Sequence, residues 1–171
     1  MKTPLLHFAA TLTISLVSCH KLTPAGFRKN YKEDFLVQNL SNQGPYGGHR
    51  AMHWRADKPN TFSSHNIINF AVKNDWHLVD SFQFQEEQTM IWTYNGSSVF
   101  PLTSAGFSNT VSNNPELEHF PRWFGGKIKL YRFRTGWIII EPGEGDLIAE
   151  NGFVLINSDK TEMAVYHLWG E

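Results

Sequence analysis

The chain has 171 residues, of which 41% are hydrophobic, 14% aromatic and 18% charged, with 15 basic against 16 acidic side chains and a single cysteine. These values exclude a disordered chain and a small disulfide-stabilised scaffold, and they predict one globular domain. The nearly neutral charge balance provides no basic face to displace counterions, so no nucleic-acid partner is expected.

The N-terminal residues have the pattern of a secretory leader. Lys2 supplies a positive start, the stretch from Leu5 to Val17 is mainly apolar, and a small residue, Ser18, precedes the cysteine, Cys19. Because the apolar stretch is short for a membrane-spanning helix, the pattern favours a cleaved leader over an anchor helix. We therefore expect residues 1–18 to be a signal peptide.

The four residues Leu16, Val17, Ser18 and Cys19 resemble the lipobox of bacterial lipoproteins. This resemblance covers only the leader and one residue beyond it. It implies that the Cys19 thiol receives a diacylglyceryl group, that the chain is cut before Cys19, and that the new amine is usually acylated as well. Two or more acyl chains attach a protein stably to a membrane. The alternatives are that Cys19 ends an ordinary secretory leader or is a small buried residue.

The position and composition of the next segment suggest a location. His20 follows the cysteine instead of an aspartate, which in enterobacterial lipoproteins implies transport to the outer membrane; we expect a lipid-anchored protein of the cell envelope. Residues 19–34 are rich in basic side chains and poor in apolar ones. They predict a tether that either contacts an anionic leaflet or serves as a solvated spacer, followed by one domain over residues 35–171.

The predicted domain is α+β and mostly β. Residues 65–73 place their apolar side chains on one arc of a helix that Ser63 or Ser64 can cap, and residues 76–84 show mainly the two-residue period of a half-buried strand. Asn95-Gly96 indicates a hairpin turn. Residues 103–126 form a long loop with a short helical turn at 115–118. Further strands are expected at 89–94, 99–102, 127–134, 137–141, 147–149, 153–157 and 162–169.

The order of these elements predicts an antiparallel meander of roughly seven to nine strands with one main amphipathic helix. Helical patterns do not alternate with the strands, which disfavours a doubly wound parallel sheet. A curved open sheet and a barrel-like sheet both remain compatible with the pattern.

His49 and His53 are the candidate metal ligands. Their spacing places both on one face of either a helix or a strand, where they could hold zinc together with a third group. The two preceding glycines favour a strand. On a strand, the alternation turns His49, Ala51, His53 and Arg55 outward and directs Met52 and Trp54 to the core, which is the pattern of an ordinary surface strand.

One carboxylate, that of Asp80, is expected on an apolar strand face, where burial of a charge is unfavourable. Asp80 is the exception on the apolar face of its strand, and a buried carboxylate must be paired or shifted in pKa. We expect Arg132 or Arg134 on a neighbouring strand to pair with it. No nucleophile motif of the G-x-S-x-G kind is present, and no cofactor is implied.

An aromatic segment within the long loop is the candidate binding surface, formed by His119, Phe120, Arg122, Trp123 and Phe124. These residue types supply much of the binding energy at protein interfaces. The alternative is that the aromatic rings fold back and plug the open end of the sheet, because so many aromatic residues in a small domain must mostly be core.

The leading functional expectation is a non-enzymatic envelope lipoprotein whose domain binds either a partner protein, as an inhibitor or immunity factor would, or an apolar ligand. A second interpretation is an envelope hydrolase, possibly metal-dependent, that uses His49 and His53 with a carboxylate such as Glu87 or Asp80. A third is a structural assembly accessory, which would present a flat exposed apolar patch and no pocket.

Overall fold

A computed structural model describes residues 27, 31–45, 47–103, 106–135 and 150–170. The expected leader, Cys19 and the predicted strands at 137–141 and 147–149 lie outside these residues. Within the described part of the chain, no helix is long and apolar enough to cross a membrane.

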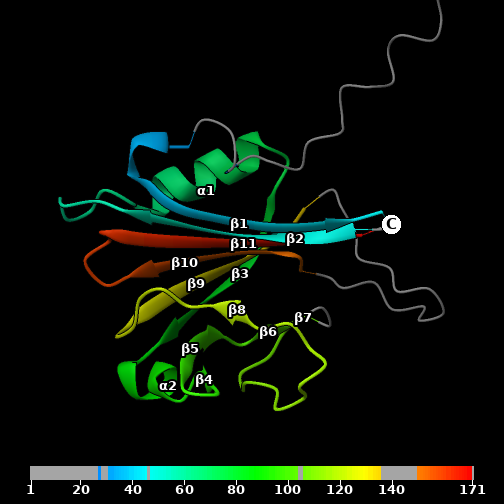
Figure 1. The fold of residues 1–171 in the computed structure, drawn as a ribbon. Helices are drawn as coiled ribbons and strands as arrows, with labels where there is room; N and C mark the ends of the chain where they lie inside the picture. The colour runs from blue at the N-terminus through cyan, green and yellow to red at the C-terminus, as the bar shows by residue number, and fades with distance from the viewer. Residues whose placement is uncertain (1–26, 28–30, 46, 104–105, 136–149, 171) are drawn as a thin grey trace, which may run out of the picture.

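A six-stranded antiparallel sheet forms the centre of the domain. Its strands lie in the order β1-β2-β11-β10-β9-β3, and they are β1 (Leu36–Gly44), β2 (Gly47–Arg55), β3 (His77–Phe84), β9 (Ile128–Arg134), β10 (Gly152–Asn157) and β11 (Glu162–Gly170). The sheet is open, with β1 and β3 as its two edges (Figure 1). The predicted mostly β, antiparallel class is confirmed. The order departs from a simple meander, because β2 pairs with β11 and β3 pairs with β9.

The main helix, α1 (Ser64–Lys73), covers one face of this sheet. The Ser63 side chain accepts a hydrogen bond from the backbone N–H of Asn66, and Asn74 caps the other end, so the predicted helix and both of its ends are confirmed. Ile67 and Ala71 are buried in a core with strand side chains that include Trp54, Val154 and Val165.

Two residues of the segment expected to be a tether belong to this same core. Phe27 and Tyr31 are buried, and the indole N–H of Trp54 donates to the Tyr31 carbonyl at 3.0 Å. A 3-10 turn, η1 (Glu33–Phe35), then leads into β1. The packed body therefore includes residues that precede the expected start at Phe35.

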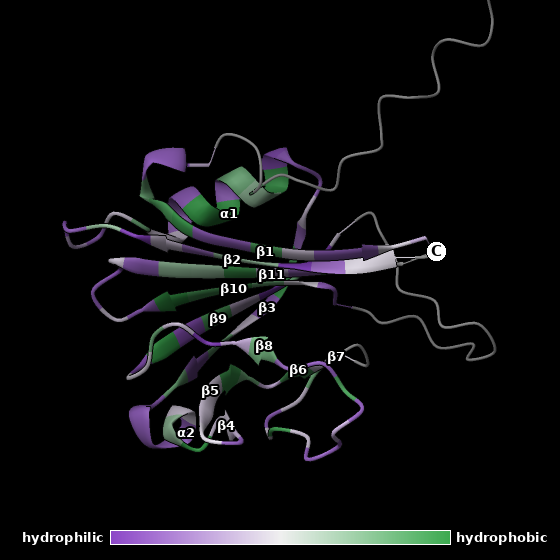
Figure 2. Ribbon diagram, in the orientation of Figure 1, coloured by the Kyte–Doolittle hydropathy of each residue, from purple (hydrophilic) through white to green (hydrophobic). Residues whose placement is uncertain are grey.

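A small lobe covers the opposite face of the sheet. It contains α2 (Glu86–Met90), a three-stranded sheet of β4 (Thr93–Tyr94), β5 (Ser97–Phe100) and β8 (Phe120–Pro121), and the pair β6 (Leu102–Thr103) with β7 (Gly106–Phe107). Phe100 and Phe120 pack with Phe153 and Tyr166 of the large sheet. The domain thus has three layers, and the central strand β10 is hydrophobic over most of its length whereas much of β1 is hydrophilic (Figure 2).

The lobe departs from the prediction at two places. A helix at residues 86–90 includes the first two residues of the strand expected at 89–94, because Gln85 and Gln88 make a reciprocal capping box. The strand is limited to Thr93–Tyr94. The predicted helical turn at 115–118 is a simple turn closed by a hydrogen bond from Leu117 N to Asn114 O. The predicted Asn95-Gly96 turn is confirmed, with both residues at positive φ.

Strand β3 is confirmed, but it is an edge strand and not a half-buried one. Phe84 is buried, whereas Leu78, Val79 and Phe82 are exposed. The Arg132 Nε donates to Asp80 Oδ1 at 2.8 Å, which confirms the predicted pairing of this carboxylate with an arginine on the neighbouring strand.

Candidate functional site

The predicted histidine pair and the predicted aromatic loop lie together on the lobe side of the sheet. Strand β2 directs both histidines to this side, and residues 118–124 cross over them. His49 Nε2 lies 3.2 Å from Glu118 Oε1, and its ring meets the Phe120 ring edge to face at 4.9 Å. Sequence reasoning treated these segments as separate candidates, and the structure makes them one site.

His53 lies beneath this loop. The residue is only 2% exposed, its Nε2 is 3.2 Å from Glu162 Oε1, and the Trp123 indole stacks on its ring with an interplanar angle of 4° and a centroid distance of 5.3 Å. The expectation that His53 and Ala51 face outward is wrong, because the loop and lobe cover that face of β2. The two-residue period of a strand shows which side chains share a face, but it does not show whether other parts of the chain bury both faces.

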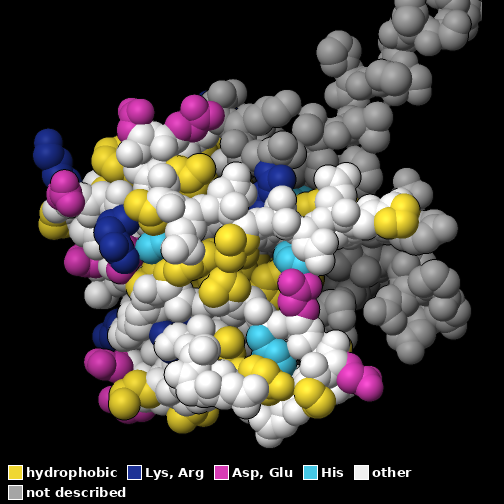
Figure 3. Space-filling model, in the orientation of Figure 1, with side chains coloured by type: hydrophobic (Ala, Val, Ile, Leu, Met, Phe, Trp, Pro, Cys, Tyr) yellow, Lys and Arg dark blue, Asp and Glu magenta, His cyan; other side chains and the backbone are white. Residues whose placement is uncertain are grey.

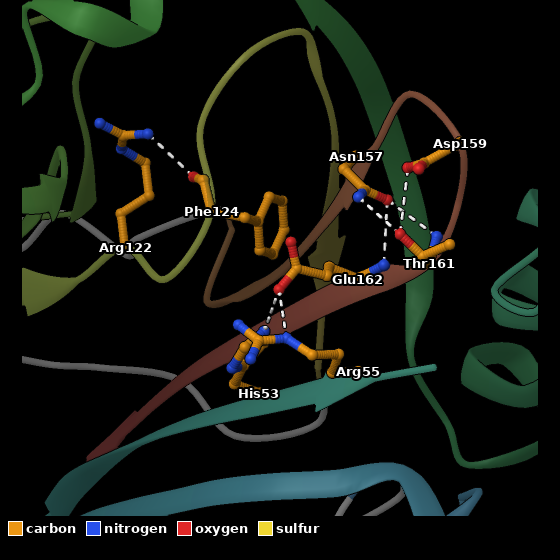
Figure 4. A network of polar contacts seen from close by, with 8 residues as sticks. All are labelled: His53, Arg55, Arg122, Phe124, Asn157, Asp159, Thr161 and Glu162. Atoms are coloured by element: carbon orange, nitrogen blue, oxygen red, sulfur yellow. Dashed lines mark hydrogen bonds and ion pairs between the residues drawn. The ribbon is translucent and has the colours of Figure 1, made fainter. Parts of the chain in front are cut away.

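Glu162 connects two side chains of β2. It is the first residue of β11, and its backbone N–H donates to the Asn157 side chain at 3.0 Å, as does that of Thr161 at 2.9 Å (Figure 4). This turn fixes the carboxylate beside β2. Its Oε1 accepts from Arg55 Nε at 2.9 Å and from His53 Nε2. Because a carboxylate only accepts, Nε2 is the protonated nitrogen of His53 in this contact.

Burial lowers the pKa of His53, and the positive charge of Arg55 lowers it further, while Glu162 opposes both effects. The folded protein therefore holds this imidazole in its neutral form at neutral pH. A neutral, buried ring that is stacked on Trp123 serves as a fixed platform for the loop. In this arrangement His53 has a structural part in positioning Trp123.

This arrangement predicts a pH dependence of stability. The folded-state pKa of His53 lies below its ordinary value of about 6.5, so the unfolded chain binds the additional proton first, and stability falls as the pH decreases below that value. Urea unfolding at pH 7.5, 6.5 and 5.5 should show a smaller loss in His53→Gln than in the wild type. His65→Gln, at an exposed position of α1, is the matched control and should lose as much as the wild type. An equal loss in His53→Gln would contradict this account.

Two further contacts hold the loop in place. The partly buried guanidinium of Arg122 donates to the Phe124 carbonyl at 2.8 Å (Figure 4) and to the Thr89 carbonyl at 3.0 Å, and the second bond joins the loop to α2. The Tyr166 hydroxyl donates to the Pro121 carbonyl at 2.6 Å, and burial raises the pKa of that hydroxyl. Hydrogen bonds therefore attach the loop both to α2 and to the large sheet.

The five predicted binding residues divide into two groups. Phe120 and Phe124 are buried, so they contribute packing. His119, Arg122 and Trp123 are only partly buried. His119 also stacks on Tyr94 of the lobe, with centroids 3.7 Å apart, and its Nε2 lies 2.9 Å from the Ser112 carbonyl. The loop thus lies packed against the sheet and does not project, and it keeps some aromatic surface accessible.

The carboxylates expected to assist the histidines lie elsewhere. Asp80 is on β3, which three intervening strands separate from β2, about 19 Å at ordinary strand spacing. Glu87 is on α2. The acids that do meet the histidines are Glu118 and Glu162, and nothing in the local sequence marks them as partners. Among the residues that the structure describes, no three His, Cys, Asp or Glu side chains are grouped to hold a metal ion.

Comparison with known proteins adds no relative. No family model, no curated protein and no solved structure matches the chain. Inference about function therefore depends on the lipobox resemblance and on the surfaces of the domain.

Proposed function

We propose that this chain is a lipid-anchored protein of the bacterial cell envelope whose domain binds a partner protein. The lipobox resemblance of Leu16 to Cys19 supports the anchor, and the residue after the cysteine favours the outer membrane. The binding surface is the aromatic face, which we define as Leu40, His49, Tyr94, His119 and Trp123.

The single observation that carries the binding proposal is that the partly exposed aromatic rings of this face are stacked on neighbouring rings. Trp123 is stacked on both His53 and Tyr166, and Tyr94 is stacked on His119. Rings that are already ordered lose little conformational entropy on association, and Trp and Tyr are typical anchors of protein interfaces. The space-filling view shows hydrophobic surface flanked by histidines in the middle of the visible face (Figure 3).

The shape of this region favours a protein over a small apolar ligand. Beside Trp123 lies a cleft of about 280 Å³ lined by residues that include Met90, Ser98 and Arg122. Ligand pockets are usually about 300–1,000 Å³ and enclose most of their ligand. This open cleft suits one anchoring side chain of a larger partner. Leu40 on β1, beside Ala51 of β2, extends the apolar surface.

Site-specific photo-crosslinking in intact cells tests this function. A benzophenone amino acid at Leu40 should give one discrete adduct with an envelope protein, and the adduct should decrease at least five-fold when Trp123→Ala is added. The same probe at Val72, an exposed position on α1, is the matched control and should give no such adduct. Far-ultraviolet circular dichroism checks that Trp123→Ala is folded.

Two results would overturn the proposal. Equal adducts from positions 40 and 72 would indicate contact without a specific surface. The absence of any adduct at position 40 in cells that contain the lipidated protein would indicate that the aromatic face has no protein partner.

A further inference from the structure

The outer edge of β3 has the features of a second binding site. Among the described residues, no strand pairs with β3 on the side away from β9. In an antiparallel sheet, alternate residues of an edge strand direct their N–H and C=O groups outward, so within the described part of the chain β3 presents backbone donors and acceptors that no other strand pairs. Phe82 is 41% exposed at the middle of this edge, and Ile91 beyond α2 is 67% exposed.

A groove runs along this edge. It has a volume of about 570 Å³, and its first wall is formed by three consecutive residues of β3, Phe82, Gln83 and Phe84. Arg132 of the neighbouring strand β9 also lines the groove, so the groove lies on the lobe side of β3 and β9 and adjoins the edge of β3. Ile91 and Trp92 after α2 contribute to the other walls, as do residues 107–109 after β7.

The side chains around the groove suit a partly apolar chain, and the one cation among the described lining residues, Arg132, is paired with Asp80. Aromatic rings from Phe84, Trp92 and Phe107 line it, together with the amides of Gln88 and Asn109. The one acid within β3, Asp80, is already paired with Arg132. Strand β3 contains no lysine and no proline, the residues by which natural edge strands commonly prevent pairing.

We propose that β3 binds an extended segment of another protein as an added strand, with alternate apolar side chains of that segment seated in the groove. Backbone hydrogen bonds along the edge supply affinity, and the aromatic walls select apolar residues at every second position. This site is separate from the aromatic face, and its existence does not depend on the function proposed for that face.

A single extended segment fits this edge better than a second copy of the chain. The groove lies between β3 and the walls from α2 and the residues after β7, so a copy that paired through β3 would bring its own α2 and β7 walls against these. The other edge strand, β1, is a weaker candidate because amide and hydroxyl side chains occupy five of its nine positions: Gln38, Asn39, Ser41, Asn42 and Gln43.

Selection from a library of displayed twelve-residue random peptides tests the proposal, with the detergent-solubilised full chain as the target. Selected peptides should share apolar residues at alternate positions. Their affinity should fall at least ten-fold for Ile91→Lys and for Phe82→Ser. It should be unchanged for Val72→Lys, which introduces the same charge at an exposed position on α1.

Backbone methylation distinguishes strand addition from capture of side chains alone. A selected peptide methylated at one backbone nitrogen at a time should lose binding at every second position only, since only those N–H groups face β3. Failure to select any peptide, absence of this two-residue period, or a protein that self-associates through β3 would each overturn the proposal. None of these outcomes bears on crosslinking from Leu40, so the two proposals fail separately.

Discussion

A chain carrying Cys19→Ala is expected to lose all lipid labelling while its domain remains folded. The thiol of Cys19 is the only one in the chain, so no other side chain can form the thioether. Cells grown with an alkyne fatty acid should label the wild type and not the variant. The wild type should also run as the shorter, processed form, and the variant should retain its leader.

Ser18→Ala is the matched control for this prediction, because it keeps a small residue before the cysteine and should be labelled and processed like the wild type. The effect of the lipid on location is large. Each buried methylene contributes about 0.8 kcal/mol to membrane binding, so two or more chains make attachment effectively stable. Wild-type protein without label, or a labelled Cys19→Ala chain, would refute the anchor.

The second large effect concerns folding stability, and Asn151→Ala should lower the free energy of unfolding by about 3 kcal/mol. Asn151 is buried just before β10 begins, beside the end of β9 and the last third of β11. Its side chain accepts from Thr135 N at 2.9 Å and donates to Thr135 Oγ1 at 2.8 Å and to the Leu168 carbonyl at 3.0 Å. Three hydrogen bonds at about 1 kcal/mol each give this estimate, and buried groups that lose these partners can increase it.

Urea unfolding followed by tryptophan fluorescence measures this effect. Asn39→Ala is the matched control, since Asn39 is exposed on the edge strand β1, and it should change the free energy of unfolding by less than about 0.5 kcal/mol. If Asn151→Ala lowered the free energy of unfolding by less than about 1 kcal/mol, these hydrogen bonds would not be a major source of stability for the three strands.

Local signals in the sequence predicted the local structure well. The helix α1 combines a capping serine with a clear apolar arc, and both features act within a few residues. The turn at Asn95-Gly96 likewise needs only two residues with positive φ. Residues 89 and 90 were assigned to a strand because the capping box of Gln85 and Gln88 lies just before a β-branched and aromatic run that resembles a strand.

The candidate site could be predicted only in part, because its contacts are remote in sequence. His49 and His53 were identified on one face of a strand, and Trp123 in a separate loop. Their meeting depends on the packing of the lobe, and Glu162 reaches His53 only through the pairing of β2 with β11. The hydrophobic pattern within β2 or within β11 does not indicate which residues of the two strands lie opposite each other.

The mass of the mature N-terminal peptide, purified from native membranes, decides whether this chain is a lipoprotein. We expect a chain that begins at Cys19 and carries the added mass of a thioether-linked diacylglyceryl group, with or without an acyl chain on its amine. A native chain with an unmodified Cys19, or one that retains residues 1–18, would contradict this expectation.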